Sequence, residues 1–181
     1  MKAYFLFLLG LFLTLMSCKS EPSLQEYFVD RAENRNFIAF ELPSKLLNID
    51  TKKLSSEQQT ALTSFEKLDI LAFQCNDKNN EGYQIEKLKV KTILKSNQFE
   101  NLIKYGNKDN EVAIYCVGNT DKINEFDVFL NKKNNGFAII RILGNNMNPN
   151  NIMVLMSILQ NANLDISALK PLENLLKNPK N

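Results

Sequence analysis

The stretch INEFDVFLNKKNNGFAIIRIL, residues 123–143, decides the fold of this chain. It holds two apolar runs, 123–130 and 137–143, and each has the length and composition of a β-strand. The residues between them are polar and end at Gly136, which is typical of a tight connection. Because a short connection joins antiparallel neighbours, the stretch predicts a β-hairpin.

Alternation within this hairpin predicts how it faces the rest of the protein, because successive strand residues point to opposite faces of a sheet. The side chains expected to point inward are Phe126, Val128 and Leu130. Glu125 and Asp127 are expected on a solvated outer face, where Arg141 pairs with one or the other across the sheet if it shares that face. The alternative is an acid–base pair of a glycan hydrolase, which requires both carboxylates to face one cleft, about 5–9.5 Å apart.

Two further runs precede the hairpin. Residues 99–105 and 111–117 are also apolar or alternating, and turn-rich segments separate all four runs. This pattern predicts a four-strand antiparallel meander. In the N-terminal half, residues 37–40 and 70–73 predict two more strands.

Capping boxes and helical spacing of apolar residues predict the helices. Ser23 with Glu26 begins a helix over 24–33, and Ser55 with Gln58 begins another. Further helical segments are expected at 43–47, at 83–95, from Pro149 with buried Ile152, Leu155, Met156 and Leu159, and around Leu169, Leu172, Leu175 and Leu176. The expected fold is α+β in one domain over residues 24–178. Its sheet is largely antiparallel, with the C-terminal four-strand meander plus two N-terminal strands, and helices pack on it.

The N-terminus predicts export and a lipid anchor. Lys2 precedes an apolar run over residues 3–16, which is the order of a secretory signal peptide. Leu15-Met16-Ser17-Cys18 resembles the lipobox of bacterial lipoproteins. The resemblance implies a leader over 1–17, lipidation of Cys18 and a short tether over 18–23. The alternative is an ordinary signal peptide that contains a cysteine.

Composition excludes several classes of function. The chain has no histidine, which excludes Ser-His-Asp and Cys-His hydrolases, HExxH metalloproteases and histidine-liganded zinc. The formal net charge is +2, and Lys2 lies in the expected leader. A nucleic-acid binder would carry a larger basic excess on one face, so no such partner is expected. No cofactor motif or metal-ligand spacing is present, and no catalytic residue is assigned.

Two cysteines remain beyond Cys18. In an oxidising compartment, Cys75 and Cys116 either form a disulfide or stay as two buried thiols within apolar strand-like runs. A bond between them would stabilise the fold by about 3–4 kcal/mol in the loop-entropy model.

Three lysines recur every four residues in the expected helix over 83–95. Lys87, Lys91 and Lys95 form a stripe on one side of a helix. Either the stripe contacts an anionic surface, such as lipid headgroups, or it is the solvated side of an amphipathic helix.

The order of these elements resembles a known family over about residues 24–160. It is carried by the lipobox, LDILAF at 68–73, a lysine-rich helix, FENLI at 99–103, EFDVFL at 125–130 and AIIRILG at 138–144. The chain resembles bacteroidete envelope lipoproteins whose domain has no known function. The resemblance implies an α+β fold and an envelope location, and it brings no catalytic residues.

The expected function is therefore a lipid-anchored module of the cell envelope that is not an enzyme. It is expected to bind or scaffold another envelope protein, from the outer membrane and facing the periplasm, with surface exposure as the alternative placement. A second hypothesis is an envelope-stress or signalling accessory that senses a ligand in a concave apolar pocket. The glycan hydrolase described above is the third.

Overall fold

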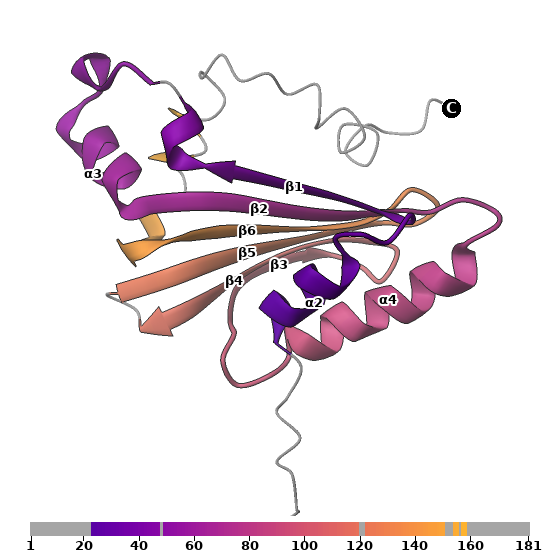
Figure 1. Cartoon of the computed structure of the whole chain (residues 1–181). Helices are drawn as coiled ribbons and strands as arrows, with labels where there is room; N and C mark the ends of the chain where they lie inside the picture. Colours follow the sequence, from indigo (N-terminus) through magenta and orange to yellow (C-terminus); the bar gives the residue numbers. More distant parts are fainter. Residues whose placement is uncertain (1–22, 48, 120–121, 151–153, 156, 159–181) are drawn as a thin grey trace, which may run out of the picture.

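The computed structural model describes residues 23–47, 49–119, 122–150, 154–155 and 157–158. Its centre is one six-stranded antiparallel sheet with the strand order β1-β2-β6-β5-β4-β3 (Figure 1). The strands are β1 (Phe37–Pro43), β2 (Phe65–Gln74), β3 (Glu100–Gly106), β4 (Asn110–Asn119), β5 (Lys122–Lys132) and β6 (Gly136–Met147). The predicted α+β class, the C-terminal meander and the two N-terminal strands are confirmed.

The helices lie on both faces of this sheet. They are α2 (Leu24–Arg31), α3 (Ser56–Ser64) and α4 (Asn80–Ile93), with 3-10 turns at Ser44–Leu47 and Thr51–Lys53. Figure 1 shows α2 and α4 side by side against one face, here named the α2–α4 face. Helix α3 and the 3-10 turns lie at one end of the sheet and pack on its other face, here named the α3 face.

Two apolar cores result, one on each face. On the α3 face, the largest buried side chains are Phe65, Phe126, Ile142, Met147 and Leu155. On the α2–α4 face, the buried aromatic side chains are Tyr27, Phe28, Phe37, Phe73, Tyr83, Phe129 and Phe137, and Ile139 packs among them. The second core contains an aromatic cluster in which Phe73 and Phe137 stack at 5.7 Å between ring centroids.

The solvated outer face predicted for the hairpin is wrong. Asp127 has no exposed surface, and Arg141 is buried. The reason is that Phe129 and Ile139 lie on the same face as these charged residues, two positions away along their strands. Burying those apolar side chains brings α2 and α4 over the charges as well.

The starts predicted from the two capping boxes and from Pro149 are correct, whereas the helix expected over 83–95 begins at Asn80 and Pro43 belongs to β1. Ser23 and Glu26 form a reciprocal capping box at α2, as do Ser55 and Gln58 at α3. Pro149 is the first helical residue after β6, and Leu155 is buried.

Other sequence predictions lie outside the described residues. They concern the leader over 1–17, Cys18, Ile152, Met156, Leu159 and the segment around Leu169 to Leu176. In the part of the chain that the structure describes, no helix has the length and apolar character to cross a membrane.

Candidate functional site

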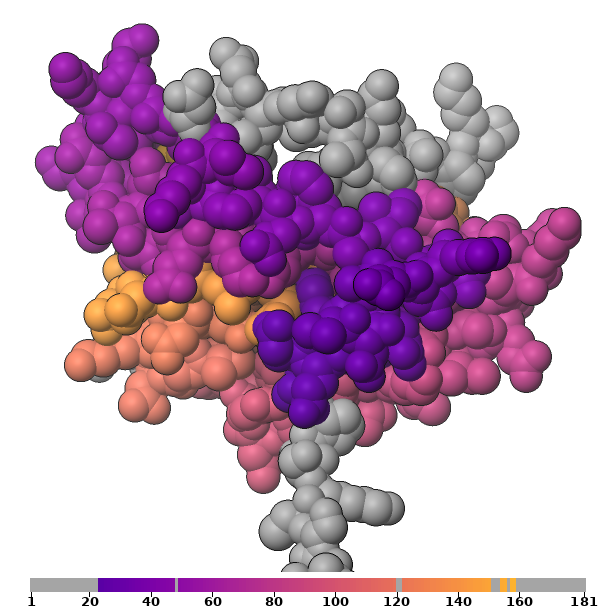
Figure 2. Space-filling model, in the orientation of Figure 1, coloured from indigo at the N-terminus to yellow at the C-terminus, as the bar shows by residue number. Residues whose placement is uncertain are grey.

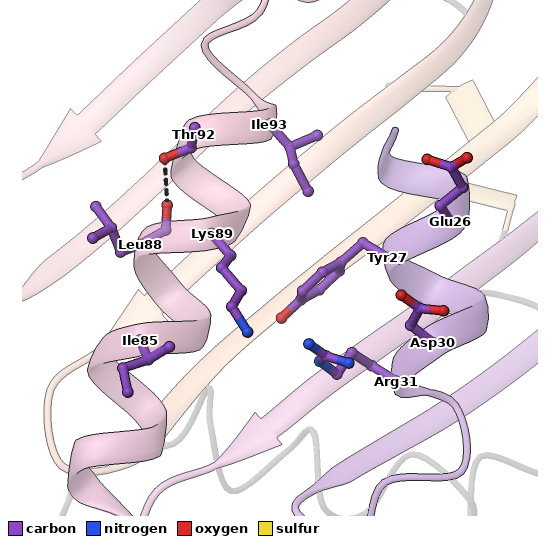
Figure 3. A pocket seen from close by; sticks show the side chains of 9 residues that line it. All are labelled: Glu26, Tyr27, Asp30, Arg31, Ile85, Leu88, Lys89, Thr92 and Ile93. Atoms are coloured by element: carbon purple, nitrogen blue, oxygen red, sulfur yellow. Dashed lines mark hydrogen bonds between the residues drawn. The ribbon is translucent and has the colours of Figure 1, made fainter. Parts of the chain in front are cut away.

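A groove of about 670 Å³ runs between α2 and α4 on the outside of the molecule. Figure 3 shows Tyr27 and Arg31 of α2 and Lys89 and Ile93 of α4 extending into the space between the helices, whereas Leu88 projects from the outer side of α4. The lining residues are Glu26, Tyr27, Asp30 and Arg31 from α2, and Ile85, Leu88, Lys89, Thr92 and Ile93 from α4. In Figure 2, the indigo surface of α2 lies at the front of the molecule beside the magenta surface of α4.

Glu86 of α4 links the two helices that form the walls of the groove. Its Oε2 accepts hydrogen bonds from Tyr27 Oη and from Arg31 Nε, both at 2.9 Å. Lys89 Nζ donates to Glu86 Oε1 at 2.7 Å. Burial opposes ionisation of Glu86, but the bonds from Arg31, Lys89 and Tyr27 outweigh it and lower its pKa. The two helices are therefore fixed to each other by an ionised carboxylate with three donors.

The same network explains the state of Tyr27. Burial, together with the nearby Glu86 carboxylate, raises the pKa of the Tyr27 hydroxyl well above its usual value. Tyr27 therefore remains a neutral hydrogen-bond donor, and its ring forms an apolar floor beside Ile93.

The rim of the groove combines exposed apolar and charged side chains. Ile85 and Leu88 of α4 are exposed, and Leu88 keeps 67% of its surface accessible. Glu26 and Asp30 lie on the α2 side of the groove. An apolar strip between charged rims is the arrangement that accepts an amphipathic ligand.

A second, smaller groove of about 300 Å³ lies on the other side of α2, along β1 and β2. Lys67 crosses it and pairs with Glu41 and Asp69, both at 3.0 Å. These partners lie within the chain, so the charges of this groove are largely satisfied internally.

Beneath α2 lies a buried charged cluster centred on Arg141 of β6. Its Nε donates to Glu125 Oε1 at 2.5 Å, and its Nη1 donates to Gln25 Oε1 at 2.5 Å. Asp127 Oδ1 lies 3.9 Å from Arg141 Nε. The predicted pairing of Arg141 across the sheet is confirmed for Glu125, whereas Asp127 lies beside the guanidinium without a hydrogen bond to it. The sequence did not indicate that Gln25 joins the cluster.

Asp127 and Glu125 form a coupled acid pair. Burial raises the pKa of Asp127 well above its usual range, and the charge of Glu125 adds to the rise, while Arg141 opposes it. Asp127 therefore retains its proton at pH values at which an exposed aspartate has lost it. Among the described residues that line the two grooves, neither carboxylate is present. Because Asp127 has no exposed surface, the two carboxylates do not face one open cleft in the part of the chain that the structure describes.

The lysine stripe is divided between internal and external contacts. Lys91 Nζ contacts Glu111 Oε2 at 2.5 Å, and the second oxygen of this buried carboxylate lies 3.3 Å from Lys104. Lys87 lies 4.5 Å from the centroid of the Tyr83 ring and donates to its hydroxyl at 3.2 Å. Burial and the neighbouring charge of Lys91 lower the pKa of Lys87. Lys95 is exposed, so the three lysines do not share one open surface.

The structure contradicts a disulfide between Cys75 and Cys116, because both are free thiols. Cys116 belongs to the core of the α3 face, whereas Cys75 packs against the core of the α2–α4 face. Strands β6 and β5 lie between β2 and β4, which separates their backbones by about 14 Å at 4.8 Å per strand. A disulfide requires Cα atoms within about 7 Å. The alternative of a buried thiol within a strand holds for Cys116, whereas Cys75 is half-buried and lies just after the end of β2.

Metal ligation has no candidate in the described ranges. No group of three or more cysteine, aspartate and glutamate side chains there is arranged to hold an ion.

The groove itself could not be recognised from sequence. Tyr27 fitted an ordinary buried helix position, and Ile85 was not singled out. The available signal was that Ile85 and Leu88, three positions apart, lie outside the buried stripe of α4 that contains Tyr83, Val90 and Ile93.

Fold and groove together define a single-sheet α+β domain with a two-helix layer. Residues 27–155 match the family described as Domain of unknown function (DUF4252), and the chain belongs to this family. The match includes the sheet, α4, Arg141 with Glu125 and Asp127, and most of the groove. No curated protein and no solved structure matches the chain.

Proposed function

We propose that this protein is a lipid-anchored module of the bacterial cell envelope that binds an apolar segment of another envelope protein in the groove between α2 and α4. Its anchor is Cys18, and it resides in the outer membrane facing the periplasm. The observation that carries the proposal is the groove, which has an apolar floor, exposed Ile85 and Leu88, and walls fixed by Glu86.

The sequence supports the anchor. The lipobox over 15–18 ends only six positions before Leu24, the first residue of α2. Five extended residues span at most about 18 Å, so an acylated Cys18 keeps α2 close to the bilayer. Since α2 forms one wall of the groove, the binding site lies within reach of membrane-associated partners.

The rigid walls of the groove support binding rather than catalysis. A preformed groove orders few side chains on binding, which reduces the entropy lost by the complex. A partner helix that lays its apolar side on Ile85 and Leu88 follows a recurrent recognition mode. The absence of histidine and the enclosure of Asp127 support a role without enzymatic activity.

The test is site-specific photocrosslinking in the native host. A photoreactive amino acid replaces Leu88 at the groove, or Leu46 on the 3-10 turn outside it. Leu46 is a matched control for Leu88, because the two side chains are 65% and 67% exposed. The proposal predicts one discrete protein adduct from position 88 that Ile85→Lys abolishes and that position 46 does not give. Identical adducts from both positions, or none from position 88, contradict it.

A second candidate function rests on the volume of the same groove. Its 670 Å³ falls within the range of about 300–1,000 Å³ typical of small-molecule sites, which fits the ligand-sensing accessory. The crosslinking experiment separates the two candidates, because a sensor adds a small mass to the Leu88 peptide instead of a protein band.

A further inference from the structure

Strand β3 is an open edge of the sheet. It pairs with β4 on one side, and no other described strand pairs with its second side. All seven of its residues, Glu100 to Gly106, are exposed. An edge strand presents a row of unpaired backbone N–H and C=O groups, and these groups accept another strand.

The side chains at this edge are unusually apolar. Among the described residues, four of the eight large apolar side chains that are exposed lie on β3 or beside it: Leu102, Ile103, Tyr105 and Val112. Tyr105 is the most exposed of them, at 78%. In the register of the two strands, Ile103 lies opposite Ile114 and Tyr105 lies opposite Val112. The side chains of Ile103, Tyr105, Val112 and Ile114 therefore share the α3 face. An apolar patch along an unpaired edge marks an interaction site.

The opposite edge of the sheet differs. Strand β1 ends at Pro43, which has no backbone N–H to donate. Glu41 of β1 forms an ion pair with Lys67 of β2. Charges and proline are the usual means by which an edge strand avoids pairing. On β3, by contrast, Lys104 turns to the other face and contacts the buried Glu111, so its charge does not lie among the apolar side chains.

We propose that β3 pairs with β3 of a second copy of this chain, in antiparallel orientation, to form a dimer with a continuous twelve-stranded sheet. Antiparallel pairing of one strand with its own copy is self-complementary and closes after two copies. Pairing of β3 with the dissimilar β1 edge would instead be heterologous and would continue as a filament. Ile103 and Tyr105 of both copies then form one apolar seam on the α3 face.

The position of the N-terminus also favours a second copy. The two-fold axis of such a dimer is perpendicular to the sheet, so it keeps both α2–α4 faces on the same side. Helix α2, which Ser23 caps, therefore lies on that side in both copies. Two chains attached to one membrane can form this dimer without turning either copy over. The dimer leaves both grooves between α2 and α4 open, so pairing of β3 does not depend on binding in the groove. The orientation of both copies toward one membrane rests on the anchor of the proposed function.

The test combines disulfide crosslinking with light scattering, both on the full-length chain purified in detergent. Cysteines are placed one at a time at 102, 103, 104 and 105 in a chain that carries Cys75→Ser and Cys116→Ala, and each variant is oxidised mildly. At least one of them is expected to form a disulfide-linked dimer, because directly opposed residues near the axis come within about 4.5–5.5 Å between Cα atoms. Leu88→Cys, which is equally accessible but lies on α4, is the control and is expected to remain monomeric.

Light scattering then measures self-association. The double variant Ile103→Lys with Tyr105→Lys is expected to dissociate about tenfold more readily than the wild type, because it removes the apolar pairs and adds like charges. Tyr105→Thr, which retains strand propensity, is expected to weaken the dimer less and to leave the fold intact. A monomeric wild type, crosslinks from Leu88→Cys alone, or β3 cysteines bonded in cells only to a different protein would each overturn the proposal.

Discussion

The guanidinium carbon of Arg141 lies 5.1 Å from the centroid of the Phe28 ring. This contact joins the middle of the sheet to the first described helix of the chain. Arg141 also donates to Gln25 of α2 and to Glu125 of β5, so one buried side chain links three elements. Helix α2 forms one wall of the groove, and its position therefore depends on Arg141 from one side and on Glu86 from the other.

Replacing Arg141 is expected to destabilise the fold strongly. Arg141→Met leaves Glu125 beside Asp127 without its cation, and loss of one partner of a buried pair costs about 3–5 kcal/mol. Chemical denaturation measures the change in the free energy of unfolding. Arg35→Met, at an exposed position, is the control and is expected to stay within about 0.5 kcal/mol of the wild type. Equal stability of the two variants would contradict the role of the cluster.

The acid pair predicts a pH dependence of stability. The folded chain holds the proton of Asp127 above the pH at which the unfolded chain releases it, because the folded pKa is raised. The free energy of unfolding of the wild type relative to Asp127→Asn therefore falls as pH rises from about 4 toward neutrality, by at most about 1.4 kcal/mol per pH unit. Denaturation curves of both proteins from pH 4 to 8 measure this difference.

Glu86 supplies the opposite control, because its pKa is lowered. The wild type is expected to have a higher free energy of unfolding than Glu86→Gln, and to lose this difference as pH falls below about 4.3, the usual pKa of a glutamate in the unfolded chain. A difference between wild type and Asp127→Asn that stayed flat or rose with pH would show that Asp127 is ionised in the folded chain.

The divided lysine stripe predicts unequal effects of equivalent substitutions. Lys91→Met removes one of the two cations at the buried Glu111 and is expected to cost about 1–3 kcal/mol. Lys95→Met, one turn further along the chain at an exposed position, is expected to change stability by less than about 0.5 kcal/mol. Thermal or chemical unfolding distinguishes them. Equal effects on stability would favour the alternative hypothesis, in which all three lysines lie on the solvated side of an amphipathic helix.

Replacing two glycines by alanine is expected to change the stability of the fold in opposite directions. Gly136 has φ +127°, and a Cβ there would lie 1.9 Å from the backbone oxygen of Phe73, so Gly136→Ala is expected to destabilise the β5–β6 hairpin by about 1–3 kcal/mol or more. Gly82 lies within α4, where a Cβ would make an ordinary 3.8 Å contact with Phe73. Gly82→Ala is expected to stabilise by about 0.5–1 kcal/mol. Melting curves of both variants test this, and a stabilising Gly136→Ala would refute the hairpin geometry.

Local signals in the sequence were sufficient for the elements and for most of the topology. The hairpin over 123–143 was predictable because its turn and alternation are both short-range features. Both capping boxes were predictable because their hydrogen bonds join residues three positions apart.

Tertiary packing decided what the sequence could not. The alternation of Phe126 with Asp127 was interpreted as one buried face and one wet face, but Phe129 and Ile139 made the second face a core as well. The groove depends on Glu86 meeting Tyr27 and Arg31 from positions more than 50 residues away in the chain. The separation of Cys75 from Cys116 likewise follows from strand order, which spacing in the sequence does not fix.

The lipid anchor at Cys18 is the central claim of the proposed function, and intact mass spectrometry of the protein from its native host tests it most directly. The account predicts a mature chain that begins at Cys18, with a diacylglyceryl group on the sulfur and an acyl group on the new amine. A chain that carries a free thiol at Cys18, or whose leader is uncut or cut at another residue, would contradict the anchor and the membrane-proximal placement of the groove.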